Sequence, residues 1–280
     1  MKKMVLTAAA LVMMATAPLA AQATTPQEDL KNFREYFMKR FPGVPLAEFA
    51  NGAYAVGGPD KRAQWEAIEE FPPYDIPLEK GKTLFETPFK NGKTYASCFP
   101  HGGKGIRQNY PYFDTKTGEV VTLEGSINAC RVKNGEKPLK WKKGALAQIS
   151  AYMAYTSRGK KLNVKIPNDP RALAAYERGR QHFYAKRGQL NMACADCHQY
   201  NSGNRIRSNT LSPALGHPTG FPVYRAKWGA LGTLHRRYGG CNKQVRAKPF
   251  KAQSEEYKDL EYFETYMSNG IAVNAPSYRE

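Results

Sequence analysis

The sequence predicts a mainly α-helical fold in which two related helical units follow an N-terminal helical extension. Three observations support this prediction. Apolar residues recur at helical spacing near both ends of the chain, strand signals are sparse, and a weak repeat relates residues 79–166 to residues 171–280. Between the two units, the prolines of Val164–Pro170 break regular structure and mark a linker.

The composition is that of a protein with a real core and a basic surface. The chain has 280 residues, of which 41% are apolar, and its mean hydropathy of −0.61 excludes a membrane protein. Outside the first twenty positions, no apolar run reaches the roughly 18 residues that a spanning helix needs. The net charge of +18 favours an acidic partner or an anionic substrate.

The first residues have the pattern of a secretory signal peptide. Lys2 and Lys3 precede an apolar stretch over 4–19, and an Ala-x-Ala site follows at 21–23. A buried N-terminal helix is the alternative interpretation. Cleavage after Ala23 would export the mature protein, and we expect it in a bacterial periplasm, where disulfides persist.

The extension over 24–78 contains two predicted helices. Thr25 can cap the first, with Pro26 at the first helical position and Glu28 three residues after the cap. The apolar residues that follow at helical spacing are Leu30, Phe33, Phe37 and Phe41. The second helix carries Trp65 and Ile68 and ends at Phe71-Pro72-Pro73.

Five correspondences in the same order indicate that the two units are a duplication. Similar seven-residue segments end at Phe85 and at Phe183, and a glycine lies six residues before Cys98 and before Cys194. A proline lies 19 residues before Cys130 and before Cys241. A Thr-Leu pair keeps its offset from these later cysteines, and each unit ends in a helical stretch containing Tyr-Met. Glu119–Leu123 could form half of a hairpin.

Cys194, Cys197 and His198 form a C-x-x-C-H motif, the attachment signature of c-type haem. Two thiols three positions apart can add to the two vinyl groups on one edge of the porphyrin, and the next residue supplies the proximal imidazole. A zinc knuckle would need a second ligand pair at short spacing, and a thioredoxin-like dithiol would need a βαβ context. We therefore predict one covalently bound haem c in the unit over 171–280.

The unit over 79–166 has lost the same motif. When the glycines are aligned, His101 stands in place of the second cysteine and Gly102 in place of the ligand histidine. We predict no haem there and a surface or hydrogen-bonded role for His101.

Three cysteines remain, and the repeat indicates which two pair. Cys98 stands where a thioether would form and Cys130 matches Cys241, so both would flank a collapsed, haem-free pocket. We expect a Cys98–Cys130 disulfide, which contributes about 3–4 kcal/mol in the chain-entropy model.

Cys241 is then left over, while the haem needs a sixth ligand or an open face. Met267, His217 and His235 are the other candidates. Met267 falls in the apolar pattern of the last helix, which favours core packing, and no positional argument favours either histidine. Cys241 follows Gly239-Gly240, which lets the backbone approach a ligand, and thiolate is a strong donor to iron.

The segment around Cys241 is strongly basic. Between 236 and 253 there is no acidic residue, and the basic ones are Arg236, Arg237, Lys243, Arg246, Lys248 and Lys251. A solvated basic face is one interpretation. The other is chemical, because positive charge favours the thiolate and attracts a small anion. Nucleic acid is a poor partner for an exported haem protein.

These motifs together resemble the SoxA family, the larger subunits of the SoxAX cytochromes of bacterial sulfur oxidation. The resemblance covers nearly the whole mature chain and rests on Trp65–Ile68, Phe71–Tyr74, Cys98–Pro100, Tyr110–Asp114, Cys130-Arg131, Cys194–His198 and Arg237–Asn242. It implies two cytochrome c-like domains, of the type that keeps only the C-terminal haem and has a disulfide at the lost site.

The resemblance also implies the roles of the site residues. Cys194 and Cys197 would hold the haem, with His198 as the proximal ligand. Cys241 would be both the distal ligand and the catalytic residue, found in the family as a persulfide, and Arg237 would bind substrate.

The implied activity is that of an L-cysteine S-thiosulfotransferase. Thiosulfate is joined to a cysteine of the carrier protein SoxYZ, with two electrons leaving through haem, and a small SoxX-like cytochrome c is the partner in a heterodimer. From the residues alone, a plain periplasmic electron-transfer cytochrome and, further off, a haem-free metal or disulfide module are the alternatives.

Overall fold

The computed structural model describes residues 24–280, so the predicted signal peptide lies outside the described residues. The fold is mainly α-helical, as predicted, and no helix within 24–280 is long and apolar enough to cross a membrane. The helices are α1 (Pro26–Arg40), α2 (Ala53–Val56), α3 (Pro59–Glu70), α4 (Asp75–Glu86), α5 (Leu123–Lys133), α6 (Ala145–Tyr155), α7 (Pro170–Tyr184), α8 (Leu234–Gln244) and α9 (Glu255–Met267). The strands are short: β1 (Tyr112–Asp114), β2 (Glu119–Val121), β3 (Arg205–Ile206), β4 (Asn209–Thr210), β5 (Val223–Arg225), β6 (Ala230–Gly232) and β7 (Ser277–Arg279).

Helix α1 begins as its capping residues predict. The Thr25 backbone N–H donates to Glu28 Oε2 over 2.8 Å, and the Glu28 N–H donates back to Thr25 Oγ1 over 3.3 Å, so the capping box is complete. The helix buries Phe33 and Phe37, and the Phe33 ring lies 6.5 Å from that of Phe263 in α9. The extension therefore shares a core with the C-terminal half of the chain.

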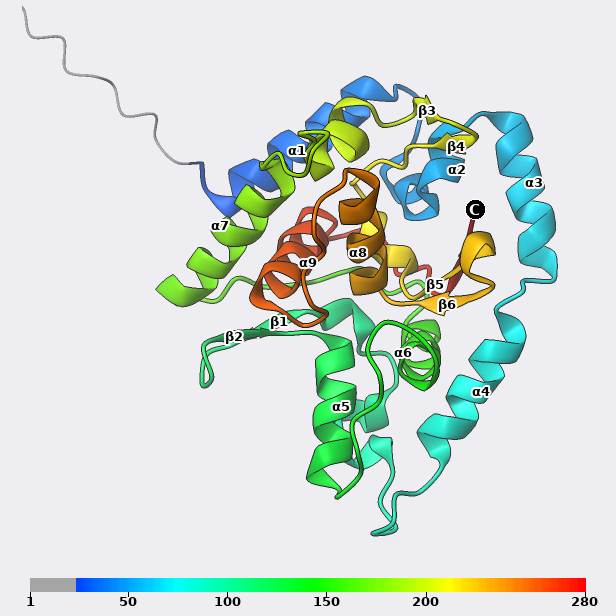
Figure 1. The fold of residues 1–280 in the computed structure, drawn as a ribbon, viewed down its shortest axis with the longest axis vertical. Helices are drawn as coiled ribbons and strands as arrows, with labels where there is room; N and C mark the ends of the chain where they lie inside the picture. The colour runs from blue at the N-terminus through cyan, green and yellow to red at the C-terminus, as the bar shows by residue number, and fades with distance from the viewer. Residues whose placement is uncertain (1–23) are drawn as a thin grey trace, which may run out of the picture.

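The second predicted helix of the extension is α3, which ends at Glu70 before the proline pair. Its Trp65 stacks on Tyr54 of α2, with ring centroids 5.1 Å apart and planes inclined by 11°. This stacking fixes α2 beside the C-terminal strand β7, where α3 also packs. Figure 1 shows the chain passing from α1 around the molecule to α3 before it enters the two repeated units.

The duplication is visible in the helix pairs. In each unit the first helix packs against the last, α4 on α6 and α7 on α9. A side chain at Gly81 would place its Cβ 2.1 Å from the Gln148 carbonyl oxygen, and one at Gly179 would lie 2.1 Å from that of Asp259. The repeated glycines are thus required because the two helix backbones touch at these points.

The hairpins repeat as well. Strands β1 and β2 pair antiparallel, with Phe113 opposite Val120, and β5 and β6 pair antiparallel, with Tyr224 opposite Leu231. A helix follows each hairpin directly, α5 after the first and α8 after the second. Glu119–Val121 is indeed one strand of a hairpin, and β7 adds a parallel third strand beside β5.

Each hairpin contributes buried side chains to the core of the other unit, while Val223 of the second hairpin stays in the core of α1, α7 and α9. Phe113 and Val120 of the first hairpin are buried in the cluster formed by α1, α7 and α9, whereas Leu231 of the second is buried in the cluster of α4 and α6. The units are therefore interlocked, and the domain boundaries at 79–166 and 171–280 remain a proposal.

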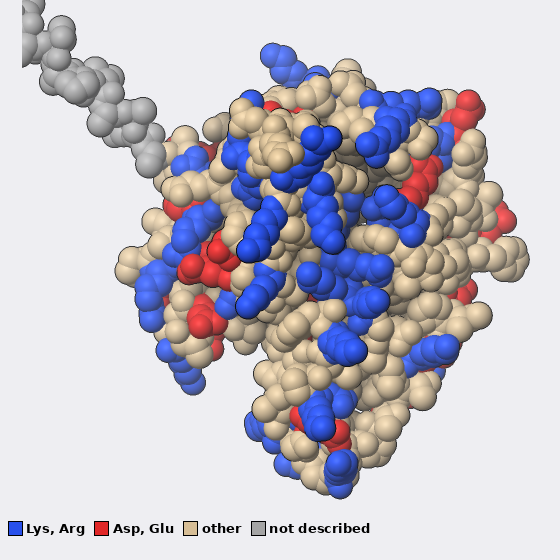
Figure 2. All heavy atoms as spheres, in the orientation of Figure 1, with Lys and Arg blue, Asp and Glu red and all other residues tan. Residues whose placement is uncertain are grey.

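Basic side chains gather in the middle of the face that Figure 2 shows. In Figure 2, Lys and Arg residues gather over the region that carries α8 and around the hollow beside it. This face holds the cavity described below.

Candidate functional site

The C-x-x-C-H motif occupies a tight turn that leads into a short π-helix. The Ala193 N–H donates to Asp196 Oδ2 over 2.7 Å, which anchors the start of the turn. The π-helix, η5 (Asp196–Tyr200), is closed by the Asn201 N–H donating to the Asp196 carbonyl over 3.1 Å. Such widened turns are frequent at functional sites. This turn carries Cys197 and His198 on consecutive residues.

His198 is held in one tautomer and orientation. The side chain is buried, 7% exposed, and its Nδ1 lies 2.8 Å from the carbonyl oxygen of Ser212. A carbonyl can only accept, so Nδ1 carries the proton and Nε2 keeps its lone pair for a metal. Burial lowers the pKa of His198, and the charge of Arg237 lowers it further, so the imidazole is neutral as a ligand must be.

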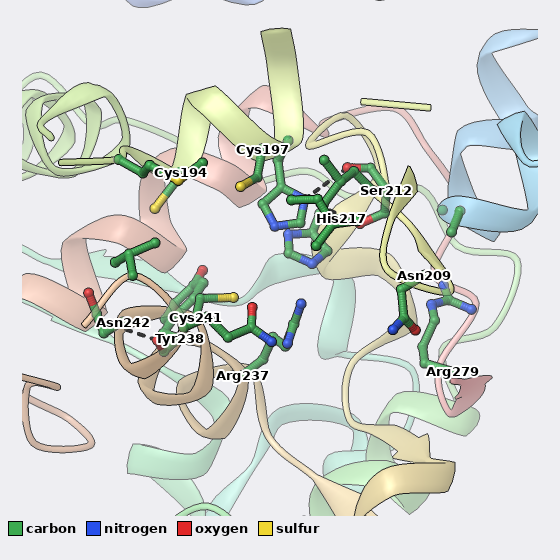
Figure 3. Close-up of a pocket in the computed structure, with 18 of the residues that line it drawn as sticks. Cys194, Cys197, Asn209, Ser212, His217, Arg237, Tyr238, Cys241, Asn242 and Arg279 are labelled. Carbon is green, nitrogen blue, oxygen red and sulfur yellow. Dashed lines mark hydrogen bonds between the residues drawn. The ribbon is translucent and has the colours of Figure 1, made fainter. Parts of the chain in front are cut away.

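A cavity of about 510 Å³ lies against the motif. It is lined by the five residues that the sequence singles out in this half: Cys194, Cys197, His198, Arg237 and Cys241. Figure 3 shows the three cysteines and Arg237 around this one space. The volume falls within the roughly 300–1,000 Å³ typical of ligand and cofactor sites.

The two thiols of the motif are kept protonated by the cavity. Burial raises the pKa of Cys194 well above its usual range. Burial also raises the pKa of Cys197, and the nearby Cys241 adds to this effect. Cys241 lines the same cavity as the attachment motif.

Helix α8 positions Cys241 and Arg237. The two residues are four apart, which places them one above the other on a single face. The Arg237 charge lowers the pKa of His198 and His217 in the same cavity. Lys243 also lines the cavity.

Arg236 points elsewhere. Its guanidinium carbon lies 4.1 Å from the centre of the Trp228 ring, and its Nη1 donates to the Leu231 carbonyl over 3.3 Å. Arg236 is absent from the cavity lining, whereas Lys243 is part of it.

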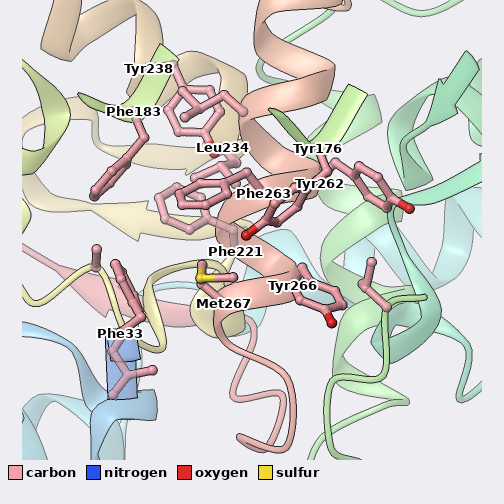
Figure 4. Close-up of a cluster of buried hydrophobic side chains, with 14 of the residues drawn as sticks. Phe33, Tyr176, Phe183, Phe221, Leu234, Tyr238, Tyr262, Phe263, Tyr266 and Met267 are labelled. Atoms are coloured by element: carbon pink, nitrogen blue, oxygen red, sulfur yellow. The ribbon is translucent and has the colours of Figure 1, made fainter. Parts of the chain in front are cut away.

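Of the other candidate ligands, Met267 has the core role that the sequence favours. It is 1% exposed and packs with Phe33, Phe221 and Phe263 in the C-terminal core (Figure 4). His235 is also buried outside the cavity lining, with Nε2 3.1 Å from Glu261 Oε2.

His217 lies in the cavity, although no positional signal in the sequence selects it. Its ring stacks on that of His198 with centroids 4.9 Å apart. Its Nδ1 lies 3.6 Å from Glu264 Oε1, and the other oxygen of that buried carboxylate accepts a hydrogen bond from Tyr238. Only the fold brings these residues from η6 (His217–Gly220), α8 and α9 together.

A disulfide and packed aromatic rings occupy the corresponding region of the first unit. Cys98 and Cys130 are joined, with an S–S distance of 2.02 Å and Cα atoms 5.8 Å apart, so the expected disulfide is present. Phe85 stacks on Tyr95 beside the bridge, and a side chain at Gly103 would place its Cβ 2.8 Å from the Phe85 ring. His101 is exposed, as the sequence predicts.

The site offers a buried histidine with a free Nε2, two motif thiols and a further sulfur donor. This set of donors fits an iron porphyrin. With the paired helices of the fold, they define a c-type cytochrome. The family model described as SoxA/TsdA, cytochrome c domain, matches residues 80–162, which lie in the unit without a C-x-x-C-H motif.

Similar proteins specify the family further. The chain is 54% identical to the L-cysteine S-thiosulfotransferase subunit SoxA of Allochromatium vinosum, over 95% of each chain. It is 56% identical to that of Chlorobaculum tepidum, over 90% of this chain and 87% of the relative. A chain in the crystal structure of SoxXA from P. pantotrophus has a TM-score of 0.72 at 30% identity, over 81% of this chain and 86% of that one. The protein belongs to the SoxA family.

Proposed function

We propose that this protein is the haem subunit of an L-cysteine S-thiosulfotransferase, which oxidatively conjugates thiosulfate to a cysteine of a carrier protein. One observation carries the proposal: Cys241 and Arg237 lie a turn apart on α8 and line the same cavity as the C-x-x-C-H residues. The alternative, a plain electron carrier, leaves this pair without a role.

The residues present would hold one covalently bound haem c. Cys194 and Cys197 would form the thioethers, and His198 Nε2 and Cys241 Sγ would be the donors to the iron. When bound, haem supplies a one-electron acceptor. Two electrons leave in each conjugation, so a second acceptor is needed, and a SoxX-like small cytochrome c in a heterodimer would provide it.

The chain's own cations would bind the substrate. Thiosulfate is a dianion, and Arg237 can hold its sulfonate oxygens through charge-assisted hydrogen bonds. Lys243 lines the same cavity and adds a second positive charge. This placement leaves the outer, sulfane sulfur of thiosulfate free to approach Cys241.

The conjugation then takes two balanced steps. Cys241 thiolate and the sulfane sulfur form an S–S bond with loss of two electrons to the cytochrome acceptors. The cysteine thiolate of a SoxYZ-like carrier next attacks that sulfane sulfur, and Cys241 leaves as thiolate. The carrier gains the thiosulfate group, and the proton of its thiol passes to solvent.

The proposed place of action is the periplasm. A signal peptide cleaved after Ala23 would export the chain to the compartment where the Cys98–Cys130 disulfide is stable.

The test replaces Cys241 by Ala in the complex with its small cytochrome partner. We expect thiosulfate-dependent loading of the carrier to fall at least 100-fold, while a haem-stained gel and the intact mass still report one haem per chain. The matched control is Cys98→Ala with Cys130→Ala, which removes sulfur from the haem-free unit. Turnover unchanged by Cys241→Ala would favour the plain electron carrier.

A further inference from the structure

One end of the cavity carries cations that the proposed conjugation does not use. Figure 3 places Cys194 and Arg279 at opposite sides of the cavity, with Cys241 and Arg237 between them. Arg279 comes from the C-terminal strand β7 and Arg225 from its neighbour β5, and both line the cavity.

The Arg279 guanidinium lies close to two glycines, where a side chain would crowd it. A Cβ at Gly52 would lie 3.3 Å from its Nη2, and one at Gly220 would lie 3.0 Å from the same atom. The guanidinium carbon lies 5.4 Å from the centre of the Tyr54 ring, and Nη1 donates to the Tyr278 carbonyl over 2.9 Å. Within residues 24–280, Arg279 forms no ion pair.

The local electrostatics leave this end of the cavity in need of an anion. Burial lowers the pKa of Arg279, an effect that Tyr54, Glu69 and Tyr74 oppose. Burial lowers the pKa of Arg225 to about 10, and the charge of Arg237 is the second cause of this decrease. Arg225 Nε donates to the Glu280 main-chain oxygen over 2.7 Å, and its guanidinium carbon lies 5.3 Å from the centre of the Trp228 ring. Arg279 has no carboxylate partner within residues 24–280, and a half-buried guanidinium in that position is costly unless a ligand supplies the negative charge.

The acidic residues that line the cavity already have partners. Glu280 Oε2 lies 2.7 Å from Lys61 Nζ, and Glu264 accepts from Tyr238. The lining basic residues outnumber these two acids and are Lys61, Arg187, Arg207, Arg225, Arg237, Lys243, Arg246 and Arg279.

We infer that Arg279 and Arg225 form an oxyanion subsite that holds a propionate carboxylate of the haem. The inference rests on the haem of the proposed function, but not on the thiosulfate chemistry. A porphyrin attached by its vinyl edge to Cys194 and Cys197 presents its propionates at the opposite edge, and the cavity end opposite Cys194 is where Arg279 lies. Arginine binds a carboxylate through two parallel hydrogen bonds.

The proposed subsite gives a role to two segments that are far apart in the sequence. The N-terminal extension supplies Gly52 and Tyr54, and the C-terminal strand supplies Arg279. Both would tune the haem by neutralising a charge beside it, which is a recognised means of setting a haem reduction potential.

The experiment measures the haem reduction potential of the purified holoprotein complex from about pH 5 to about pH 9. Arg279→Gln is compared with Arg279→Lys and with Arg205→Gln, a control for loss of an exposed positive charge outside the cavity lining. The KM for thiosulfate is measured in parallel, because thiosulfate is the other oxyanion that this subsite could bind in place of the propionate.

We expect Arg279→Gln to shift the potential to more negative values, because an unpaired carboxylate favours ferric iron. The pH below which the potential becomes pH-dependent should rise, because the carboxyl loses its cationic partner. Arg279→Lys should give a smaller shift, and Arg205→Gln should match the wild type, with the KM of all three within about twofold of it (about 0.4 kcal/mol).

Two results would overturn the inference. A wild-type potential and pH profile in Arg279→Gln with a tenfold higher KM would assign the subsite to thiosulfate. A wild-type potential, pH profile and KM would make Arg279 purely structural. Should Arg279→Gln fail to incorporate haem, Arg225→Gln and Arg279→Lys test the same expectations.

Discussion

Removing the Cys98–Cys130 disulfide by Cys98→Ala with Cys130→Ala should destabilise the protein without changing its haem chemistry. The bridge closes a loop of 32 residues, and the chain-entropy model converts that length into about 4 kcal/mol of lost stability at 25 °C. For a chain of this size, that corresponds to a melting temperature lower by roughly 10 °C. The haem content should be unaffected, because the bridge lies in the unit that has no C-x-x-C-H motif.

The assay is urea unfolding of the oxidised holoprotein, followed by far-UV circular dichroism. Wild-type protein reduced at the bridge is the matched control, since it loses the cross-link but keeps both side chains. The double variant and the reduced protein should unfold at the same lower urea concentration. A difference from the oxidised wild type below about 1 kcal/mol would refute the loop-entropy reasoning.

Three further perturbations test other parts of the account. Arg237→Ala should lower turnover at least tenfold while the haem absorption spectrum stays intact; a collapsed spectrum would instead make Arg237 structural. Gly179→Ala should lower the free energy of unfolding by about 1–3 kcal/mol, because its Cβ would meet the α9 backbone. Gly240→Ala is the control, since a Cβ there has open space and should not destabilise the protein. Equal effects of the two substitutions on unfolding in urea would contradict this reasoning. Burial raises the pKa of Glu124, and the Glu261 charge raises it further, so its contribution to stability is full below the ordinary carboxyl pKa and is lost as the pH rises through the folded-state value. Glu124→Gln should flatten this pH dependence of urea unfolding, and an unchanged slope would show that another group causes it.

The sequence predicts the local features of this fold well. Thr25 and Glu28 predict the start of α1, and the repeat, aligned through Gly92 and Gly188, predicts the disulfide. These features depend on residues close in sequence or on a repeat that can be compared with itself. The close helix contacts at Gly81 and Gly179 appear only in the structure.

The remaining features depend on long-range packing. Nothing near Phe113 or Leu231 indicates that each hairpin packs into the other unit's core. Arg236 and Arg237 are adjacent arginines, so residue type does not distinguish them. Their positions on α8 do, because Arg236 packs on Trp228 whereas Arg237 lines the cavity. Tyr54 and Arg279 meet from opposite ends of the chain, so no local pattern could have joined them.

The most direct test of the central claim is electron paramagnetic resonance of the oxidised, purified holoprotein beside its Cys241→Ala variant. The account predicts a low-spin signal of the thiolate-ligated type in the wild type, which is lost in the variant although one haem remains attached. An identical signal in both proteins, or an absorption band of methionine-ligated iron in the wild type, would contradict it.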